Sequence, residues 1–508
     1  MTRAACAAVV GAGAVGLLAG VVSAAAQTAD LALPAAARLG DHAAAAAALA
    51  AGADTNAAEP DGTTALHWAA YRDDADLASL LLAGGADPNR ANRHDATPLS
   101  LACRTGDPDV IGRLVAAGAD PALVASDGEP PLLACARTGR VTAVEHLLAA
   151  GADVNATETW RGQTALMWAA AENHAPMVAR LLAAGADIEA TSTGGYNALL
   201  FAVRQGAVET VELLLAAGAD ASASAPGGES ALHVAVTNGH HTPGALLLAH
   251  GADPGAADSA GRTVLHTLVA ARAPARRQRP PGADPIDSLT FMDTLLEHGA
   301  DPNARTDPGR KLTDRTVSSA SRPALDNVLN RGGATPYYLA AEAADVEAMD
   351  VLEAHGADPR IPTFENTTPL MAAAGIVFVE GSRPTRTEAE ALEAVRLAAA
   401  AGVDLDAVNE QGQSALHGAV YRGAESIIRF LAGAGADLNL QDQRGRTPLD
   451  LAAQGFNQVA SVIRREAEAA VLGELGAVRN PLSRSGLEFD WEEYQAAGEA
   501  EETEVPGR

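Results

Sequence analysis

Apolar side chains in the stretch 61–93 recur twice with a spacing of three and four residues. The first stripe is formed by Leu66, Ala69 and Ala70, and the second by Leu77, Leu80 and Leu81. This spacing places each set on one face of a short α-helix. Thr64 stands where an N-cap residue accepts a bond from the first turn, and Gly85 where a left-handed residue ends a helix. The pattern predicts two short helices joined by a turn.

The tripeptide Gly-Ala-Asp follows the second stripe and returns along most of the chain. Its glycines, counting one Gly-Val-Asp, are Gly52, Gly85, Gly118, Gly151, Gly185, Gly218, Gly251, Gly299, Gly356, Gly402 and Gly435. Most intervals are 33 residues; one is 34, and three that contain extra residues are 48, 57 and 46. A fixed period near 33 indicates a solenoid, in which each helix pair buries its apolar face on the next.

A second motif marks the start of the first helix in many copies. It reads "TALHWAA" from Thr64, "TALMWAA" from Thr164, "SALHVAV" from Ser230 and "SALHGAV" from Ser414. Together with the spaced Gly-Ala-Asp, this motif resembles the ankyrin-repeat family over about residues 35–476. The resemblance implies an all-α solenoid of about 11–12 helix-turn-helix repeats with hairpin-like tips. At a helix spacing of roughly 10 Å, we expect an elongated, curved array on the order of 100 Å long, with a concave binding face.

The predicted domain organisation follows the repeats. It comprises a signal peptide (1–26), an N-terminal capping repeat (34–60), six regular repeats (61–259), three repeats with insertions (260–410), a regular repeat (411–443), a C-terminal capping repeat (444–479) and an acidic, disordered tail (480–508). In the last capping repeat, "VASVIRREAEAAVLGEL" predicts an amphipathic helix that closes the core.

Insertions lengthen three repeats. About 15 extra residues precede Gly299, about 24 precede the copy "ATPYYLAAEAAD", and about 13 precede Gly402. Two segments contain them, 270–333, which is near neutral or slightly basic, and 375–390. Inserted loops in repeat proteins often carry function, and solenoids also tolerate loops without one. Both interpretations stay open.

The first 26 residues have the pattern of a secretory signal. Arg3 precedes a long uncharged apolar run that ends in Ala24-Ala25-Ala26, an A-x-A cleavage pattern. An uncleaved membrane anchor is the alternative. No later segment has the length and apolarity of a membrane span. We expect an exported protein, periplasmic in a bacterium or extracellular, with no membrane insertion after cleavage.

Composition and motifs argue against several classes of function. The net charge is −28, which disfavours nucleic acid and anionic membranes as partners. Hydrophobic residues make up 48% of the chain but aromatic residues only 3%, which fits closely stacked alanine-rich helices. We find no G-x-S-x-G, H-E-x-x-H or Walker motif, and "GAGAVG" at 11–16 lies in the signal segment. The sequence predicts no enzyme, no cofactor and no metal.

Four histidines follow the repeat leucine and invite a chemical interpretation. They are His67, His233, His266 and His417, and each stands three residues after a Thr or Ser. The resemblance implies a structural role, in which the imidazole exchanges hydrogen bonds with that Thr or Ser and with neighbouring backbone. The adjacent His240 and His241 lack the Cys or carboxylate partners at useful spacing that a metal site needs.

Cys103 and Cys135 stand at neighbouring interior positions of adjacent repeats. They are either two buried, inert thiols or a disulfide between repeats, which an exported protein permits.

Candidate binding residues lie at the variable positions of the first helices, where the resemblance places a concave recognition face. They are Trp68, Tyr71, Arg104, Arg137, Trp168, Phe201, Arg204 and Tyr421. Arginine and aromatic side chains are the types that dominate interface energies. For Trp68 and Trp168 the competing interpretation is packing between first helices. For the arginines it is an ordinary exposed position at the end of a helix.

The sequence therefore predicts a monomeric, non-enzymatic scaffold that binds protein partners. Alternatives are an accessory or inhibitor of a periplasmic enzyme linked to oxidative stress, and a secreted effector that binds host proteins. Catalysis built from the insertions is a further hypothesis. A fold of this kind does not identify the partner.

Overall fold

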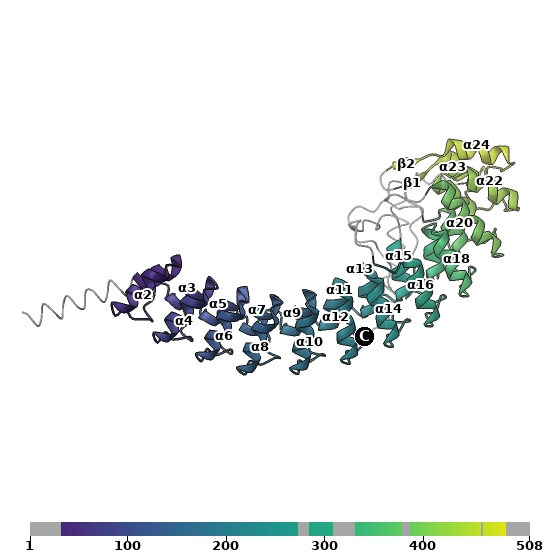
Figure 1. Cartoon of the computed structure of the whole chain (residues 1–508). Coiled ribbons are helices and arrows are strands. Elements are labelled where there is room, and N and C mark those ends of the chain that lie inside the picture. The colour runs from purple at the N-terminus through teal and green to yellow at the C-terminus, as the bar shows by residue number, and fades with distance from the viewer. Residues whose placement is uncertain (1–31, 273–283, 308–330, 378–386, 459–460, 484–508) are drawn as a thin grey trace, which may run out of the picture. The chain divides into compact units, whose positions relative to one another are not determined.

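A computed structural model describes residues 32–272, 284–307, 331–377, 387–458 and 461–483 (Figure 1). The predicted signal peptide, most of the predicted tail and the central parts of the insertions lie outside these residues. The chain divides into two compact units, Met1–Pro226 (unit 1) and Gly227–Arg508 (unit 2). No helix of the described residues combines the length and apolarity that crossing a membrane requires.

Unit 1 is a stack of helix pairs that begins with a helical segment at 32–39. Its helices are α2 (His42–Ala50), α3 (Ala65–Tyr71), α4 (Ala75–Ala83), α5 (Pro98–Thr105), α6 (Pro108–Ala116), α7 (Pro131–Arg137), α8 (Val141–Ala149), α9 (Ala165–Ala171), α10 (Ala175–Ala183), α11 (Ala198–Gln205) and α12 (Val208–Ala216). Figure 1 shows the first helices α3 to α11 in one row and the second helices α4 to α12 in a row beside it.

Unit 2 continues the same pairing in its own stack. Its helices are α13 (Ala231–Asn238), α14 (His241–Ala249), α15 (Val264–Arg272), α16 (Ser288–Glu297), α17 (Pro336–Glu342), α18 (Val346–Ala354), α19 (Pro369–Ala374), α20 (Glu388–Ala400), α21 (Ala415–Arg422), α22 (Glu425–Ala434), α23 (Pro448–Gln454) and α24 (Glu466–Glu474). The strands β1 (Phe456–Gln458) and β2 (Ser461–Ile463) pair antiparallel. The protein is an all-α repeat solenoid with this short hairpin added near its end.

Local sequence explains where the helices begin and end. Thr97 accepts from the amide of Ser100 at 3.2 Å, while the Ser100 hydroxyl accepts from the amide of Thr97 at 3.0 Å, a reciprocal cap. Asp74 caps the second helix of the preceding repeat by accepting from the Leu77 amide at 3.0 Å. Gly85 adopts φ +89°, a left-handed conformation that L side chains rarely adopt. These helix ends are therefore set by local side chains and by a left-handed glycine.

The core of each repeat is small and shared with its neighbours. Ala69 and Ala70 of α3 and Leu77 and Leu81 of α4 are fully buried. Alanine at the contacts between first helices allows close approach, and each buried leucine contributes about 1.5–3 kcal/mol. No pair buries this surface alone, so stability depends on the adjacent repeats.

Loops between the second helix of one repeat and the first helix of the next form a series that we call fingers. In unit 1 they are finger 1 (51–64), finger 2 (84–97), finger 3 (117–130), finger 4 (150–164) and finger 5 (184–197). Asn56 of finger 1 accepts from the Asp87 amide at 2.7 Å and donates to the Gly85 carbonyl at 3.3 Å. Asn89 repeats both bonds one finger further on. This asparagine ladder fixes the register of successive fingers.

The ladder crosses the longest insertion. Asn303 accepts from the Asp358 amide at 2.7 Å and donates to the Gly356 carbonyl at 3.0 Å. Asn303 and Gly356 are 53 residues apart, whereas Asn56 and Gly85 are 29 apart. The difference of 24 equals the predicted length of the insertion. The described residues on either side of the insertion therefore keep the contacts of an uninterrupted repeat.

The C-terminal repeat differs from the prediction. The stretch "VASVIRREAEAAVLGEL" does not form one helix, because strand β2 occupies Ser461–Ile463 and α24 begins only at Glu466. Gly455, at φ +91°, ends α23 and directs the chain into β1, in which Phe456 is fully buried. Helix α24 packs on α22 and α23, so it still covers the end of the stack.

Candidate partner-binding surface

The His67 side chain links two repeats through hydrogen bonds. Its Nδ1 accepts from the Thr64 amide at 3.1 Å, and its Nε2 lies 2.9 Å from the Ala96 carbonyl of the next finger. A carbonyl oxygen can only accept, so Nε2 carries the proton and the ring is neutral. Both nitrogens are thus occupied, and the side chain is fully buried. This imidazole has no free nitrogen for catalysis or metal binding.

The other three histidines make the same contacts. Their Nδ1 atoms accept from the amides of Ser230, Thr263 and Ser414, and their Nε2 atoms contact the carbonyls of Arg262, Ala334 and Arg446. Burial lowers the pKa of all four imidazoles, and that of His266 falls to about 4. All four are therefore neutral at pH 7, as hydrogen-bonded parts of the scaffold.

The His266 contact also spans two insertions. It reaches Ala334 across 68 residues, whereas His67 reaches Ala96 across 29. The difference of 39 equals the combined lengths of the two predicted insertions, about 15 and about 24 residues. This contact, like the asparagine ladder, shows that α15 and α17 remain neighbouring first helices.

The first helices of unit 1 expose part of the predicted aromatic set. Tyr71 is 58% exposed at the end of α3, and its ring meets the Trp68 ring edge-on at 6.0 Å. Trp68 is half-buried, and its Nε1 donates to Glu59 of finger 1 at 3.2 Å. The Trp68 ring therefore packs on its neighbours and stays partly exposed.

Two arginines of the row are paired with carboxylates from finger 3. Arg104 of α5 donates to Asp127 at 3.0 Å, and Arg137 of α7 lies 3.4 Å from Glu129. Burial raises the pKa of Glu129. The Arg104–Asp127 pair is exposed, and such pairs contribute about 0–1 kcal/mol. Asp127 therefore holds Arg104 only weakly.

Trp168 lies one repeat further on, in α9. The guanidinium of Arg137 stacks over its ring at 5.5 Å from the centroid, an arrangement that holds both side chains. Its Nε1 is buried and has no hydrogen-bond partner among the residues that the structure describes. A buried donor without a partner costs about 1–3 kcal/mol.

Two predicted contact residues are not accessible. Phe201 of α11 is 7% exposed because Tyr196 of finger 5 packs against it at 5.8 Å, which leaves Arg204, stacked at 5.3 Å, as the exposed member of that group. Tyr421 is fully buried under Phe456, whose ring it meets edge-on at 4.8 Å. Assigning these two rings to the binding surface was wrong, because Tyr196 of finger 5 covers Phe201 and Phe456 of β1 covers Tyr421.

One exposed aromatic side chain escaped the sequence analysis. Trp160 of finger 4 is 58% exposed. Finger 4 has 15 residues where the other four fingers have 14. The available signal was the interval of 34 between Gly151 and Gly185, which places one extra residue in this finger. Trp160 lies outside the helical positions from which the candidate residues were predicted.

Cys103 and Cys135 are joined by a disulfide, with their Cα atoms 4.5 Å apart. They connect α5 to α7, the first helices of adjacent repeats, and both are fully buried. The disulfide decides between the two alternatives that the sequence left open. It cross-links the part of unit 1 that carries Arg104 and Arg137.

The repeat geometry agrees with a comparison to known families. A model of ankyrin repeats, spanning three copies, matches residues 33–125, 132–225, 199–306 and 387–470. The chain belongs to the ankyrin repeat family. This ankyrin-repeat protein keeps the family geometry also between the matched segments, where Thr335 caps α17 by accepting from the Tyr338 amide at 3.1 Å. Ankyrin repeats are modules for binding proteins, which makes the first helices and fingers the surface to consider.

The described parts of this ankyrin-repeat protein contain no group of three or more His, Cys, Asp or Glu side chains placed to hold a metal ion. A shallow depression lies between α5 and finger 3, lined by Ser100, Arg104, Asp127, Glu129 and their neighbours. It is far too small for a small-molecule ligand.

Proposed function

We propose that this protein is a non-enzymatic scaffold that binds partner proteins through the row of first helices in unit 1. The observation that carries the proposal is the series Tyr71, Arg104, Arg137 and Arg204, which reaches the surface from four first helices, α3, α5, α7 and α11. Aromatic and arginine side chains supply most of the binding energy in protein interfaces.

We further propose that the protein works outside the cytoplasm. The disulfide between Cys103 and Cys135 supports this location, because disulfides persist in oxidising compartments and are rare in the cytosol. Cell fractionation tests it directly: the protein should be recovered in the periplasmic or extracellular fraction. Recovery in the cytosol with both cysteines reduced would overturn the proposal.

Replacing Tyr71 and Arg104 by alanine is expected to weaken partner binding by about 10–100-fold, because hot-spot truncations cost 2 kcal/mol or more. The partner is first captured from periplasmic extract by the full chain and identified by mass spectrometry, and its dissociation constant is then measured by calorimetry. Arg113→Ala on the second helix α6 is the matched control and should leave affinity unchanged. Equal losses in both variants would contradict the use of the first-helix row.

The double variant Trp68→Ala with Trp168→Ala separates binding from packing. We expect an affinity loss of about tenfold or more with unchanged helicity by circular dichroism, because both rings are partly exposed. A large drop in melting temperature, with the affinity per folded molecule unchanged, would show that both rings serve only as core.

A further inference from the structure

Fingers 2, 3 and 4 carry a surface that the first-helix row does not include. Finger 2 exposes Arg90 and Arg93, and finger 4 exposes Arg161 beside Trp160. These three arginines form no ion pair with any described residue. Finger 3, between them, exposes Leu123 at 36% and Val124 at 43%. The three fingers thus present apolar side chains flanked by unpaired cations.

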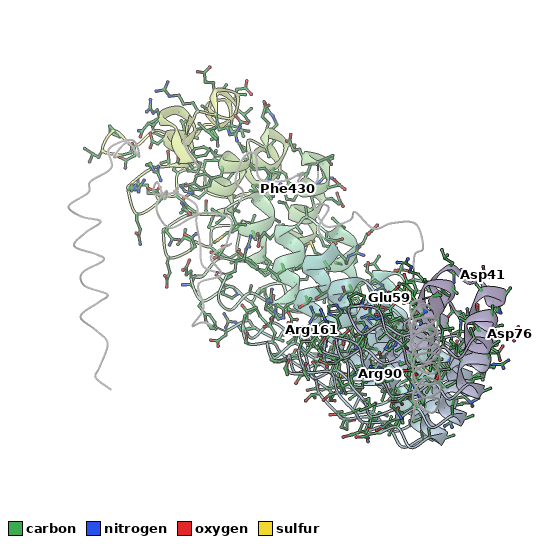
Figure 2. The ribbon with its side chains drawn as sticks, turned by 90° about the vertical axis from the view of Figure 1, so that its left-hand side faces the viewer. Asp41, Glu59, Asp76, Arg90, Arg161 and Phe430 are labelled. Carbon is green, nitrogen blue, oxygen red and sulfur yellow. A yellow bond between two sulfur atoms is a disulfide. The ribbon has the colours of Figure 1, made fainter. Side chains whose placement is uncertain are left out.

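The fingers are adjacent in space as well as in sequence. Ser126 of finger 3 donates from its amide to the His94 carbonyl of finger 2 at 3.1 Å, and from its hydroxyl at 2.7 Å. Gly128 of finger 3 lies against Thr159 of finger 4. Figure 2 shows Arg90 and Arg161 together on one side of unit 1, and Asp76, from a second helix, on the opposite side. The surface is therefore one continuous strip.

Finger 4 is held rigid at its tip. Glu158 is 1% exposed, and its carboxylate accepts from the amides of Trp160 at 2.7 Å, Arg161 at 2.8 Å and Gln163 at 2.8 Å. Hydrogen bonds to a carboxylate are about twice as strong as neutral ones. The extra residue of this finger is thus fixed in place, and Trp160 is presented to solvent with little ordering cost left for binding.

Acidic side chains near the strip are largely engaged with the chain itself. Asp87, Asp120 and Asp153 occupy equivalent positions near the start of fingers 2, 3 and 4, where each accepts from the amide two residues further on and keeps its charge. Asp127 pairs with Arg104, and Glu158 is bound as described. Asp95 is exposed on finger 2 and offsets part of the positive charge. The rest of the chain is strongly acidic, but charges beyond about 8 Å are largely screened at physiological salt. Midway along the three fingers, Arg90, Arg93 and Arg161 therefore stand against two exposed carboxylates, Asp95 and the Arg104-bound Asp127.

We propose that fingers 2–4 bind an extended acidic segment of the partner protein in which apolar or aromatic side chains alternate with carboxylates. The carboxylates pair with Arg90, Arg93 and Arg161, while the apolar side chains cover Leu123, Val124 and Trp160. The inference rests on the proposed function and deepens it, because it specifies the chemistry of the partner. The three arginines discriminate against basic segments, and the Trp160 ring against segments without apolar side chains.

The test uses a fluorescein-labelled nine-residue peptide with four glutamates, one phenylalanine and one leucine, titrated against the full chain by fluorescence anisotropy. The triple variant Arg90→Gln, Arg93→Gln and Arg161→Gln should weaken binding at least tenfold, and Trp160→Ala about tenfold. The matched control, Arg113→Gln with Arg140→Gln and Arg180→Gln, makes the same change in charge away from the fingers and should bind like the parent. Circular dichroism verifies that each variant folds.

The outcomes separate this inference from the proposed function. Equal binding by the finger variant and the control, or tighter binding of the same peptide with glutamine in place of glutamate, would overturn the inference. So would tighter binding of a single-stranded oligonucleotide of equal charge. If the captured natural partner loses affinity with the Tyr71 and Arg104 variant but not with the finger variants, the inference fails and the proposed function stands.

Discussion

Acidification from pH 7 to pH 4 is expected to lower the stability of this protein well before its carboxylates are protonated. Four buried imidazoles, those of His67, His233, His266 and His417, have pKa values below the ordinary 6.5. The unfolded chain binds protons at these positions as the pH falls through 6.5, whereas the folded chain binds them only at lower pH. Stability from this source is complete above pH 6.5 and is lost as the pH falls toward the folded pKa.

His266 gives the scale of the effect, since its pKa of about 4 lies 2.5 units below the ordinary value. Each unit is worth about 1.4 kcal/mol, so this residue alone accounts for roughly 3 kcal/mol by the time the folded form is protonated. Carboxylates with lowered pKa values act below pH 4, so the two effects fall in separate windows. The four buried histidines are therefore the main acid-sensitive elements between pH 6.5 and 4.

Guanidinium denaturation at several pH values measures this loss, and His266→Leu provides the comparison. Leucine is a natural occupant of the same repeat position, at Leu133 and Leu200. The variant should be less stable at pH 7, because a cap and an inter-repeat bond are lost. Its stability should also depend less on pH. Titration of the His266 ring near pH 6.5 by nuclear magnetic resonance would contradict the prediction.

Removal of the disulfide by Cys103→Ala with Cys135→Ala is expected to destabilise unit 1 by roughly 3–4 kcal/mol, the entropy of closing a loop of this length. The two cysteines are 32 residues apart. Alanine is the natural residue at the equivalent positions of α3, where Ala69 and Ala70 are also fully buried. The substitution therefore removes the cross-link and leaves a packing that the stack already uses.

The disulfide prediction is checked in two steps. Mass spectrometry of a non-reduced digest should show the peptides of Cys103 and Cys135 linked. Denaturant unfolding, followed through hydrogen exchange of α5 and α7, should then show the largest loss of protection in the double variant near these helices. Separate, unlinked peptides in protein purified without reductant would contradict the pairing. A matched single variant, Ala136→Val in α7, controls for general disturbance of the core.

Most of the fold could be predicted from the sequence because the same motifs occur in many repeats. The spacing from Thr or Ser to His occurs in four copies, and the Gly-Ala-Asp period placed nearly all the helices. The hairpin β1–β2 was missed because it departs from that period, and nothing upstream of Gly455 supplied a copy for comparison. A pattern that recurs is predictable, and a single event in one repeat is not.

The candidate surface was only partly predictable for a related reason. Repeat register places a side chain on a face, but exposure depends on what a neighbouring loop covers. Tyr421 and Tyr71 occupy similar positions, yet Phe456 buries the former and no described residue covers more than part of the latter. Cys103 and Cys135 could be placed on adjacent helices, but their distance needed the backbone itself. The interval of 34 indicates one extra residue in finger 4, the loop that contains Trp160, so the lengths of the loops also help to predict the surface.

The contacts preserved on both sides of the insertions bear on how the length of this chain can change in evolution. His266 and Asn303 make the same contacts as their counterparts in uninterrupted repeats, so chain length between repeats is uncoupled from their geometry. Residues can therefore be gained or lost at these points without shifting any downstream helix. The solenoid can therefore accept new segments between its repeats, and the repeats on either side keep their positions in the stack.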